Sequence, residues 1–231
     1  MAKIIITAGG TQEKIDDVRS IHNQATGKLG SLIAERLFQE GHEITYIYGP
    51  NAHKPQHPEK LIAIESVNDL DHVVRALLSQ EDYDVFIHSM AVSDFFVSGH
   101  YTYEEIKSSN QEAELNKEKA NKISSDKPIY LQLSPAPKVI AQVKKIQPDI
   151  KLIGFKLLAG ATDEELIAAA QKQISKSHSD FVIANHIEEV HTDKHRALFI
   201  SHNGVLKSVS TKQEIADYLS VIIKKEATSN E

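Results

Sequence analysis

Short apolar runs alternate with amphipathic stretches along this chain, and the alternation predicts its secondary structure. Runs rich in β-branched and aromatic residues are typical of buried strands, whereas apolar positions three and four residues apart are typical of helices. By this pattern we expect strands at 3–8, 43–48, 61–65, 83–88, 129–133, 151–157 and 180–184. We expect helices at 28–39, from a cap at Asn68 or Asp69 to 78, from 139 onward and at 163–176.

The C-terminal region shows a different pattern. Two further strands, 197–200 and 205–209, are joined by Asn203-Gly204, a dipeptide typical of tight β-hairpins. Thr211 and Glu214 form a capping box for a last helix. The chain is therefore expected to end in a hairpin and a helix, with residues 226–231 as a frayed tail.

The order of these elements predicts the fold class. A strand leading into a helix, followed by strands alternating with helices, favours an α/β, Rossmann-like fold with a doubly wound, largely parallel sheet. We expect a single domain over 1–231. Residues 97–127 interrupt the alternation with Gly, Ser, Asn, Glu and Lys, and this composition predicts a mobile flap inserted into the domain.

Glycines mark the end of the first predicted strand. Gly9 and Gly10 end it, a long polar stretch follows, and the next helix begins after Gly27. Backbone N–H groups and a helix N-terminus at such a turn are suited to phosphates. A tight turn without a ligand is the alternative, but such turns need only about two to six residues. Ligands of such sheets bind beyond the carboxyl ends of the strands. Asp94 follows a second strand at this edge, and it is either a residue of the site or a turn former.

Composition narrows the classes of function. Lys and Arg number 26 against 32 Asp and Glu, so the net charge of −6 disfavours a general nucleic-acid or membrane-surface binder. The chain has no Cys, which excludes disulfides and a cysteine nucleophile and fits a cytoplasmic protein. The start has no signal-peptide pattern, and no apolar run reaches the ~20 residues of a membrane span. The 12 His form no metal-binding motif, so we expect no metal site built by the protein alone.

Seven motifs occur along the chain in an order that is more specific than any one of them. They are Ile6–Thr11 with Glu13, Asp16, Val18 and Arg19; Ile21–Gly27; Ala91–Asp94; Lys122–Ile123; Pro137–Lys138; Gly154–Lys156; and Ala184–Asn185. Together they resemble phosphopantothenate–cysteine ligase, also called phosphopantothenoylcysteine synthetase, in its stand-alone bacterial form. The resemblance covers nearly the whole chain.

This resemblance implies a reaction in coenzyme A biosynthesis. The enzyme would join 4′-phosphopantothenate to L-cysteine, with CTP rather than ATP as the nucleotide and Mg²⁺ neutralising its phosphates. The carboxylate would form an acyl-cytidylate, and the cysteine amine would then displace CMP. The resemblance also implies a homodimer, and a separate protein would have to carry out any subsequent decarboxylation.

The resemblance further implies roles for individual residues. Asn23 would donate to the acyl oxygen, Lys122 would act as a mobile cation of the flap, and Arg19 would position the loop or an anionic substrate. Positions matching the nucleotide contacts are Gly9, Gly10, Met90, Asp94, Pro137, Phe155, Lys172 and Lys176, and those matching the substrate or intermediate contacts are Arg19, Gly27 and Ala91. Lys172 and Lys176 could instead complement the dipole of their helix.

The sequence departs from the family pattern at two places, and two other functions remain open. Ala25 stands where many members have Ser, and residues 156–159 replace a family run that contains an acidic residue. An NAD(P)-dependent oxidoreductase shares the strand, glycine turn and helix, but the long loop after Gly10 does not fit G-x-G-x-x-G. A non-catalytic nucleotide-binding module is the other alternative, and the presence of both Asn23 and Lys122 counts against it.

Overall fold

An eight-stranded sheet forms the centre of the computed structural model, which describes residues 1–57, 59–108, 123–190 and 194–227. The strands lie in the order β12-β11-β10-β9-β6-β1-β4-β5. Their bounds are β1 (Lys3–Ala8), β4 (Glu43–Tyr48), β5 (Lys60–Ala63), β6 (Val85–His88), β9 (Lys151–Leu158), β10 (Phe181–His186), β11 (Ala197–Ser201) and β12 (Gly204–Val209).

The direction of the strands confirms the predicted α/β class. Strands β5, β4, β1, β6, β9 and β10 pair in parallel, whereas β11 and β12 pair antiparallel as the expected hairpin. The chain builds outward from β1 to β4 and β5 and then returns to the other side of β1 with β6. The strand order therefore reverses between β1 and β6, which is where doubly wound proteins bind their ligands.

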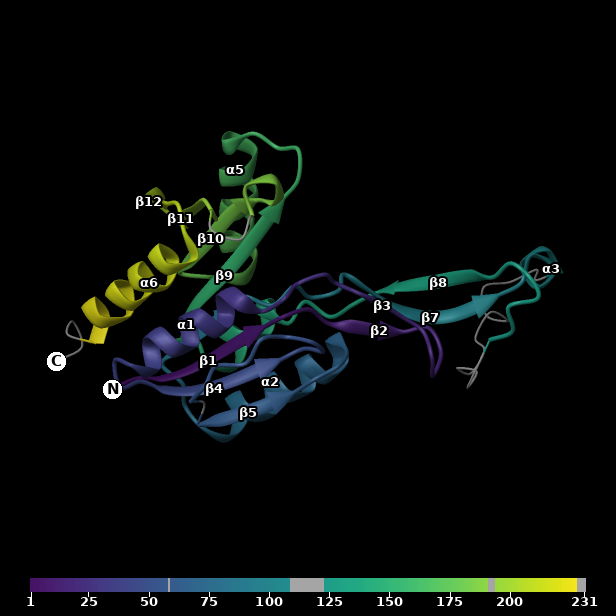
Figure 1. Cartoon of the computed structure of the whole chain (residues 1–231), viewed down its shortest axis with the longest axis horizontal. Coiled ribbons are helices and arrows are strands. Elements are labelled where there is room, and N and C mark those ends of the chain that lie inside the picture. The colour runs from purple at the N-terminus through teal and green to yellow at the C-terminus, as the bar shows by residue number, and fades with distance from the viewer. Residues whose placement is uncertain (58, 109–122, 191–193, 228–231) are drawn as a thin grey trace.

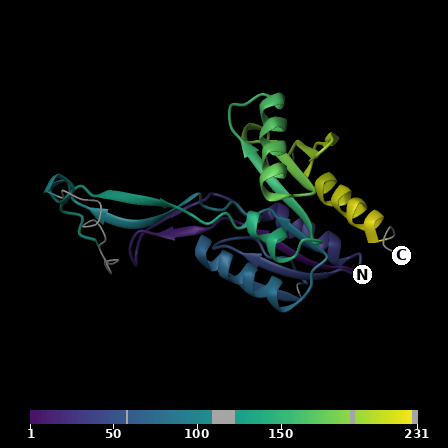
Figure 2. The same cartoon turned by 180° about the vertical axis from the view of Figure 1, so that it is seen from behind.

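Helices cover both faces of the sheet. Successive side chains along a strand point to opposite faces, and both sets are apolar in the central strands. Ile4 and Ile6 of β1 pack in one core with α1 (Lys28–Phe38) and α6 (Lys212–Ala227). Ile5, between them, packs in a second core with α2 (Val67–Gln80) and α4 (Ile140–Ile146). Helix α5 (Asp163–Ser177) covers β10 and β11 in a third core through Leu166 and Ala170. Helices α1, α2, α5 and α6 are labelled in Figure 1, and Figure 2 shows the same arrangement from behind.

A long arm projects from the body of the molecule. Strands β7 (Phe95–Tyr101) and β8 (Tyr130–Pro135) pair antiparallel along it, and α3 (Tyr103–Ser108) lies at its far end (Figure 1). A second ribbon, β2 (Gln12–Lys14) with β3 (Ser20–His22), lies between the arm and the body. The start of β1 and the end of α6 lie on the opposite side of the body from the arm.

Three local features differ from the expectations. Helix α2 begins after Ser66, whose hydroxyl accepts from the Asp69 N–H at 3.2 Å, so Asp69 completes a capping box instead of being the cap. The polar stretch after Gly10 contains β2 and β3, and β7 occupies part of the expected flap. Strands β2 and β3 escaped prediction because their three residues each lack an alternating apolar pattern. Strand β7 escaped it because it runs into a segment dominated by polar residues.

The domain organisation and the two chain segments expected to be mobile concern residues that are only partly described. The single domain and the flap at 97–127 stay predictions, and residues 109–122 of the flap lie outside the described residues. Helix α6 runs to Ala227, so it overlaps the start of the expected frayed tail. In the part of the chain that the structure describes, no helix is both long and apolar enough to span a membrane.

Candidate functional site

The loops that follow β1 and β6 meet at the reversal of strand order. Gly10 and Ala91 form a parallel bridge that continues the pairing of the two strands. The Ala91 N–H donates to the Gly9 carbonyl at 2.8 Å, and the Thr11 N–H donates to the Ala91 carbonyl at 3.1 Å. The structure thus brings together three residues predicted to contact ligands: Gly9, Gly10 and Ala91.

Glycine is required where other segments approach this crossing. A Cβ on Gly10 would lie 2.5 Å from the Asn23 carbonyl oxygen, closer than any side chain tolerates. Gly27, the N-cap of α1, has a φ of 70° and no side-chain cap, and a Cβ there would lie 3.1 Å from the Gly9 nitrogen. The N-terminus of α1 therefore lies directly beside the glycine turn, in the arrangement that favours anions.

Asn23 spans the two loops. Its backbone N–H donates to the Thr11 carbonyl at 3.2 Å, and its side-chain amide donates to the Ala91 carbonyl at 3.1 Å and the Ser93 hydroxyl at 3.3 Å. Ser93 and Thr11 also share a hydroxyl–hydroxyl bond of 2.8 Å. The amide predicted to be catalytic is thus held at the crossing by both loops.

A buried histidine that the sequence analysis passed over supports the second loop. His88, the last residue of β6, shares a 2.8 Å hydrogen bond through Nδ1 with the Thr7 hydroxyl. Burial lowers the pKa of His88 to about 4, so the ring is neutral at pH 7. Its signal in the sequence is a histidine at the end of an apolar strand, just before the loop with Ala91.

Arg19 contacts the protein itself in this structure. Its Nη2 and Nε donate to the Asp16 carboxylate at 2.6 and 3.1 Å, and Nη2 also donates to the Ile123 carbonyl at 2.9 Å. Hydrogen bonds from Arg19 and from the Ile123 N–H lower the pKa of Asp16. Of the two roles expected for Arg19, this geometry favours positioning of the loop. Lys122, the other predicted catalytic residue, lies outside the described residues.

Asp94 and Pro137 lie together at the base of the arm. The Asp94 carboxylate pairs with the Lys138 ammonium, and the Asp94 carbonyl accepts from the Ala136 N–H at 2.9 Å. The Asp94 side chain is 74% exposed, so it is accessible to a ligand. Met90, between this residue and β6, instead buries its side chain in the core under α2 and α4, which leaves its backbone to line the loop.

The remaining three predicted contacts lie along β9 and α5. Phe155 is half-buried in β9, and it follows Gly154, the partner of His88, so it lies level with the start of the loop after β6. Lys176 lies in the last turn of α5, which leads to the amino end of β10 at the opposite edge of the sheet. Lys172, one turn earlier, is exposed like Lys176. The structure brings Phe155, but neither lysine, to the edge where the loops cross.

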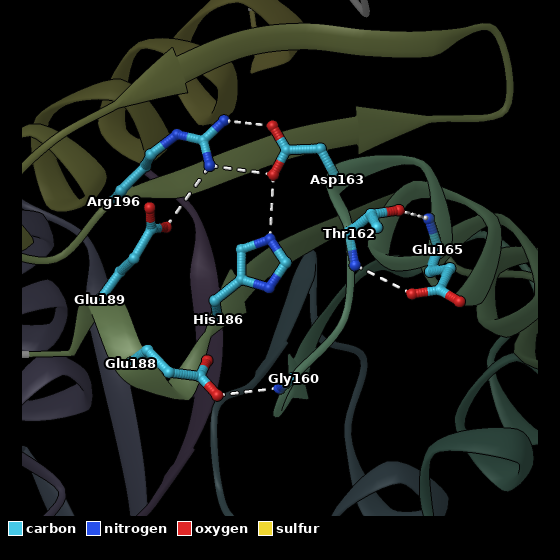
Figure 3. A network of polar contacts seen from close by, with 8 residues as sticks. All are labelled: Gly160, Thr162, Asp163, Glu165, His186, Glu188, Glu189 and Arg196. Atoms are coloured by element: carbon cyan, nitrogen blue, oxygen red, sulfur yellow. Dashed lines mark hydrogen bonds and ion pairs between the residues drawn. The ribbon is translucent and has the colours of Figure 1, made fainter.

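A separate polar network closes the carboxyl end of β10 (Figure 3). Asp163, the first residue of α5, accepts from both outer nitrogens of Arg196 at 3.0 and 2.5 Å and is 2.9 Å from His186 Nε2. Arg196 is also 3.4 Å from Glu189 in the short helix η2 (Ile187–Glu189). The neighbouring Arg196 and His186 lower the pKa of Asp163. The network joins α5, β10 and the start of β11, and it does not contact the crossing of the loops.

Comparison with known proteins gives consistent matches over the chain. The family model of the DNA/pantothenate metabolism flavoprotein C-terminal domain matches residues 1–226. Two relatives are coenzyme A biosynthesis bifunctional proteins CoaBC. The protein from Thermococcus kodakarensis is 35% identical over 94% of this chain and 49% of its own length. The protein from Methanocaldococcus jannaschii is 29% identical over 96% and 50%. The chain thus spans about half the length of the curated relatives that it matches.

Solved structures agree with this result. The DNA/pantothenate metabolism flavoprotein from Streptococcus pneumoniae has a TM-score of 0.90 and 38% identity, covering 98% of this chain and 100% of that one. A Cab2 mutant in complex with phosphopantothenate-cysteine has a TM-score of 0.74, covering 100% and 89%, but at 18% identity it shows a shared fold alone. The chain therefore belongs to the family of the DNA/pantothenate metabolism flavoprotein C-terminal domain.

Proposed function

We propose that this chain joins 4′-phosphopantothenate to L-cysteine in coenzyme A biosynthesis, through an acyl-cytidylate formed with CTP. The observation that carries the proposal is Asn23, whose amide is held where the loops after β1 and β6 cross. The names of the relatives support the pathway, and a protein of the same fold, a Cab2 mutant, is solved in complex with phosphopantothenate-cysteine.

The first step activates the carboxylate of phosphopantothenate. A carboxylate oxygen attacks the α-phosphorus of CTP, the bond to the bridging oxygen breaks, and pyrophosphate leaves. Both reactants are anions, so they must be held together against their mutual repulsion. The glycine turn and the uncapped N-terminus of α1 at Gly27 supply backbone donors for the phosphates. Lys122 supplies positive charge as the transition state forms.

The second step forms the amide. The cysteine nitrogen attacks the acyl carbon, CMP leaves with the bonding electrons, and the nitrogen loses a proton. Negative charge develops on the acyl oxygen, and an N–H donor aimed at that oxygen lowers the barrier. The Asn23 amide supplies this donor by exchanging its 3.3 Å contact to Ser93 for the acyl oxygen.

The proposed Mg²⁺ would be held mainly by the nucleotide phosphates. Mg²⁺ keeps several waters and usually takes one or two carboxylates in addition to phosphates. The exposed carboxylate of Asp94, next to the crossing, fits this requirement once it exchanges Lys138 for the cation. When bound, Mg²⁺ would neutralise phosphate charge, while Lys138 would remain close to the same group.

A homodimer completes the proposal. Five large apolar side chains on the arm and the adjacent ribbon are 47–70% exposed: Val18, Phe95, Tyr103, Tyr130 and Leu133. Such a set of exposed apolar residues is typical of a protein–protein interface. We assign it to a second copy of this chain.

One assay tests the activity. Purified protein is mixed with phosphopantothenate, cysteine, Mg²⁺ and either CTP or ATP, and both pyrophosphate and CMP or AMP are measured. We expect cysteine-dependent release of CMP with CTP and much slower turnover with ATP. Absence of cysteine-dependent turnover with either nucleotide would refute the ligase, and binding of NADPH by calorimetry would then favour the oxidoreductase.

A further inference from the structure

The Asp16 carboxylate is a buried junction between two distant parts of the chain. Its side chain is fully buried. Oδ1 accepts from the Val18 and Arg19 N–H groups at 3.0 and 2.7 Å, and Oδ2 accepts from Arg19 Nε and Nη2 at 3.1 and 2.6 Å. Oδ2 also accepts from the Ile123 N–H at 3.1 Å, so one carboxylate takes five donors.

The junction holds the backbone of Ile123 at both of its polar groups. Asp16 takes its N–H, and Arg19 Nη2 donates to its carbonyl at 2.9 Å. Ile123 is itself buried, with 8% of its surface exposed. Two side chains of the loop between β2 and β3 therefore fix one residue that lies more than a hundred positions later in the chain.

The two segments that Asp16 joins each lie next to a residue proposed to be catalytic: Asn23 in one segment and Lys122 in the other. Arg19 directly precedes β3, and Asn23 directly follows it. Ile123 directly follows Lys122 in the sequence. We propose, on the basis of that function, that Asp16 is a positioning residue of the ligase, which sets the Asn23 loop and the chain at Ile123 in fixed relation to each other.

A second Asp–Arg pair offers a matched control. Asp163 binds Arg196 through two short contacts of 3.0 and 2.5 Å, but it joins α5 to β11 and lies away from the crossing of the loops. Asp163→Asn and Asp16→Asn make the same chemical change in two Asp–Arg pairs, although the Asp16 carboxylate is fully buried and that of Asp163 is partly exposed. A purely structural role for Asp16 predicts a lower melting temperature with the wild-type kcat in the folded variant, whereas a positioning role predicts loss of kcat for Asp16 alone.

The experiment measures kcat and KM with CTP, phosphopantothenate and cysteine for wild type, Asp16→Asn, Asp163→Asn and each combined with Lys122→Gln. Small misplacements of reacting groups cost about 10²-fold in rate, so we expect this loss of kcat for Asp16→Asn, with KM for cysteine changed by less than about threefold. Asp163→Asn should retain the wild-type kcat. If Asp16 acts through the chain at Ile123, adding Lys122→Gln to Asp16→Asn should cost much less than it costs the wild type.

Melting temperatures of all variants report folding separately. Asp16→Glu, which keeps the charge but displaces the carboxylate, provides a second test if Asp16→Asn does not fold, and it should also lose kcat. A wild-type kcat in the folded Asp16 variants, or strictly multiplicative effects with Lys122→Gln, would overturn the proposal. Absence of turnover in the wild type would instead refute the ligase function on which it rests.

Discussion

At the scale of single residues, the site depends on which polar groups already have partners. Asn23 uses its amide donors on the Ala91 carbonyl and the Ser93 hydroxyl, so its orientation is set before a substrate arrives. Once the proposed substrate has replaced Ser93 at one amide donor, the contact to Ala91 keeps the amide in place, so no further reorganisation is needed when charge develops. The identity of the side chain at 23 should therefore matter more than its size.

Asn23→Asp replaces the amide donor with an acceptor of the same shape. The variant should form the acyl-cytidylate but react slowly with cysteine, with a loss of about 10²–10³-fold in the second step. Rapid-quench measurement of pyrophosphate and CMP separates the two steps. Gln24→Glu makes the same amide-to-acid change at an exposed neighbour and should keep both rates. Equal rates of CMP release in Asn23→Asp and wild type would contradict the assigned role.

His88 makes the stability depend on pH. Its pKa is lowered from 6.5 to about 4 by burial, so the unfolded chain binds a proton before the folded one does. The stabilising contribution is complete above pH 6.5 and declines as the pH falls toward 4, by about 2 kcal/mol at pH 5. Urea unfolding of His88→Asn from pH 7 to 5 should show a shallower loss than wild type. His202→Asn, at an exposed site, should not change the slope.

At the scale of elements, the sequence predicts the sheet because each of its central strands is buried on both faces. Ile4, Ile5 and Ile6 form such a run, and they lie in two different cores on opposite sides of β1. The short strands β2 and β3 are held by pairing between polar segments instead, and β7 is held by pairing with β8 along the arm. Their stability comes from partners that local periodicity does not reveal.

The network at the start of α5 should affect acid stability without affecting activity. Arg196 and His186 lower the pKa of Asp163 below its ordinary value near 4. The contribution of Asp163 to the free energy of unfolding is therefore present above pH 4, and it is lost as the pH falls through the lower pKa of the folded protein. The pair is partly exposed, so the contribution should be at most about 1 kcal/mol. Asp163→Asn should therefore flatten the stability curve below pH 4 in chemical unfolding. An unchanged curve would mean that the ion pair contributes nothing.

The candidate site was predictable only in part, because contacts between segments far apart in the sequence leave no local pattern. The glycine turn and Ala91 follow adjacent strands, and parallel topology places them at one edge. The contact of Asp16 with Ile123 spans 107 positions, and no spacing rule indicates it. The fold-family match to residues 1–226 confirms the family that the ordered motifs indicated. The individual residue roles stay predictions.

At the scale of the whole molecule, the proposed dimer would form through the arm, apart from the packing of the body. Its exposed apolar side chains do not belong to any of the three cores, which consist of the central sheet and its helices. A second copy should therefore dock on the arm without rearranging the sheet.

Phe95→Asp places a charge among the apolar side chains of the arm. Because Phe95 is 52% exposed, the body should fold normally while the dimer dissociates to monomers. Analytical ultracentrifugation measures the mass, and circular dichroism measures the fold. Leu61→Asp, at a 41% exposed position on β5 far from the arm, is the control and should remain dimeric. A monomeric wild type, or a dimeric Phe95→Asp variant, would refute the assignment.

The position of the two chain ends has a consequence for protein fusion. The start of β1 and the end of α6 lie on the side of the body opposite the arm (Figure 1). A polypeptide joined at either end would extend away from the crossing of the loops and from the apolar arm. Fusion of a longer protein at either end should therefore leave the arm accessible. This freedom suits a family in which matched relatives are about twice as long as this chain.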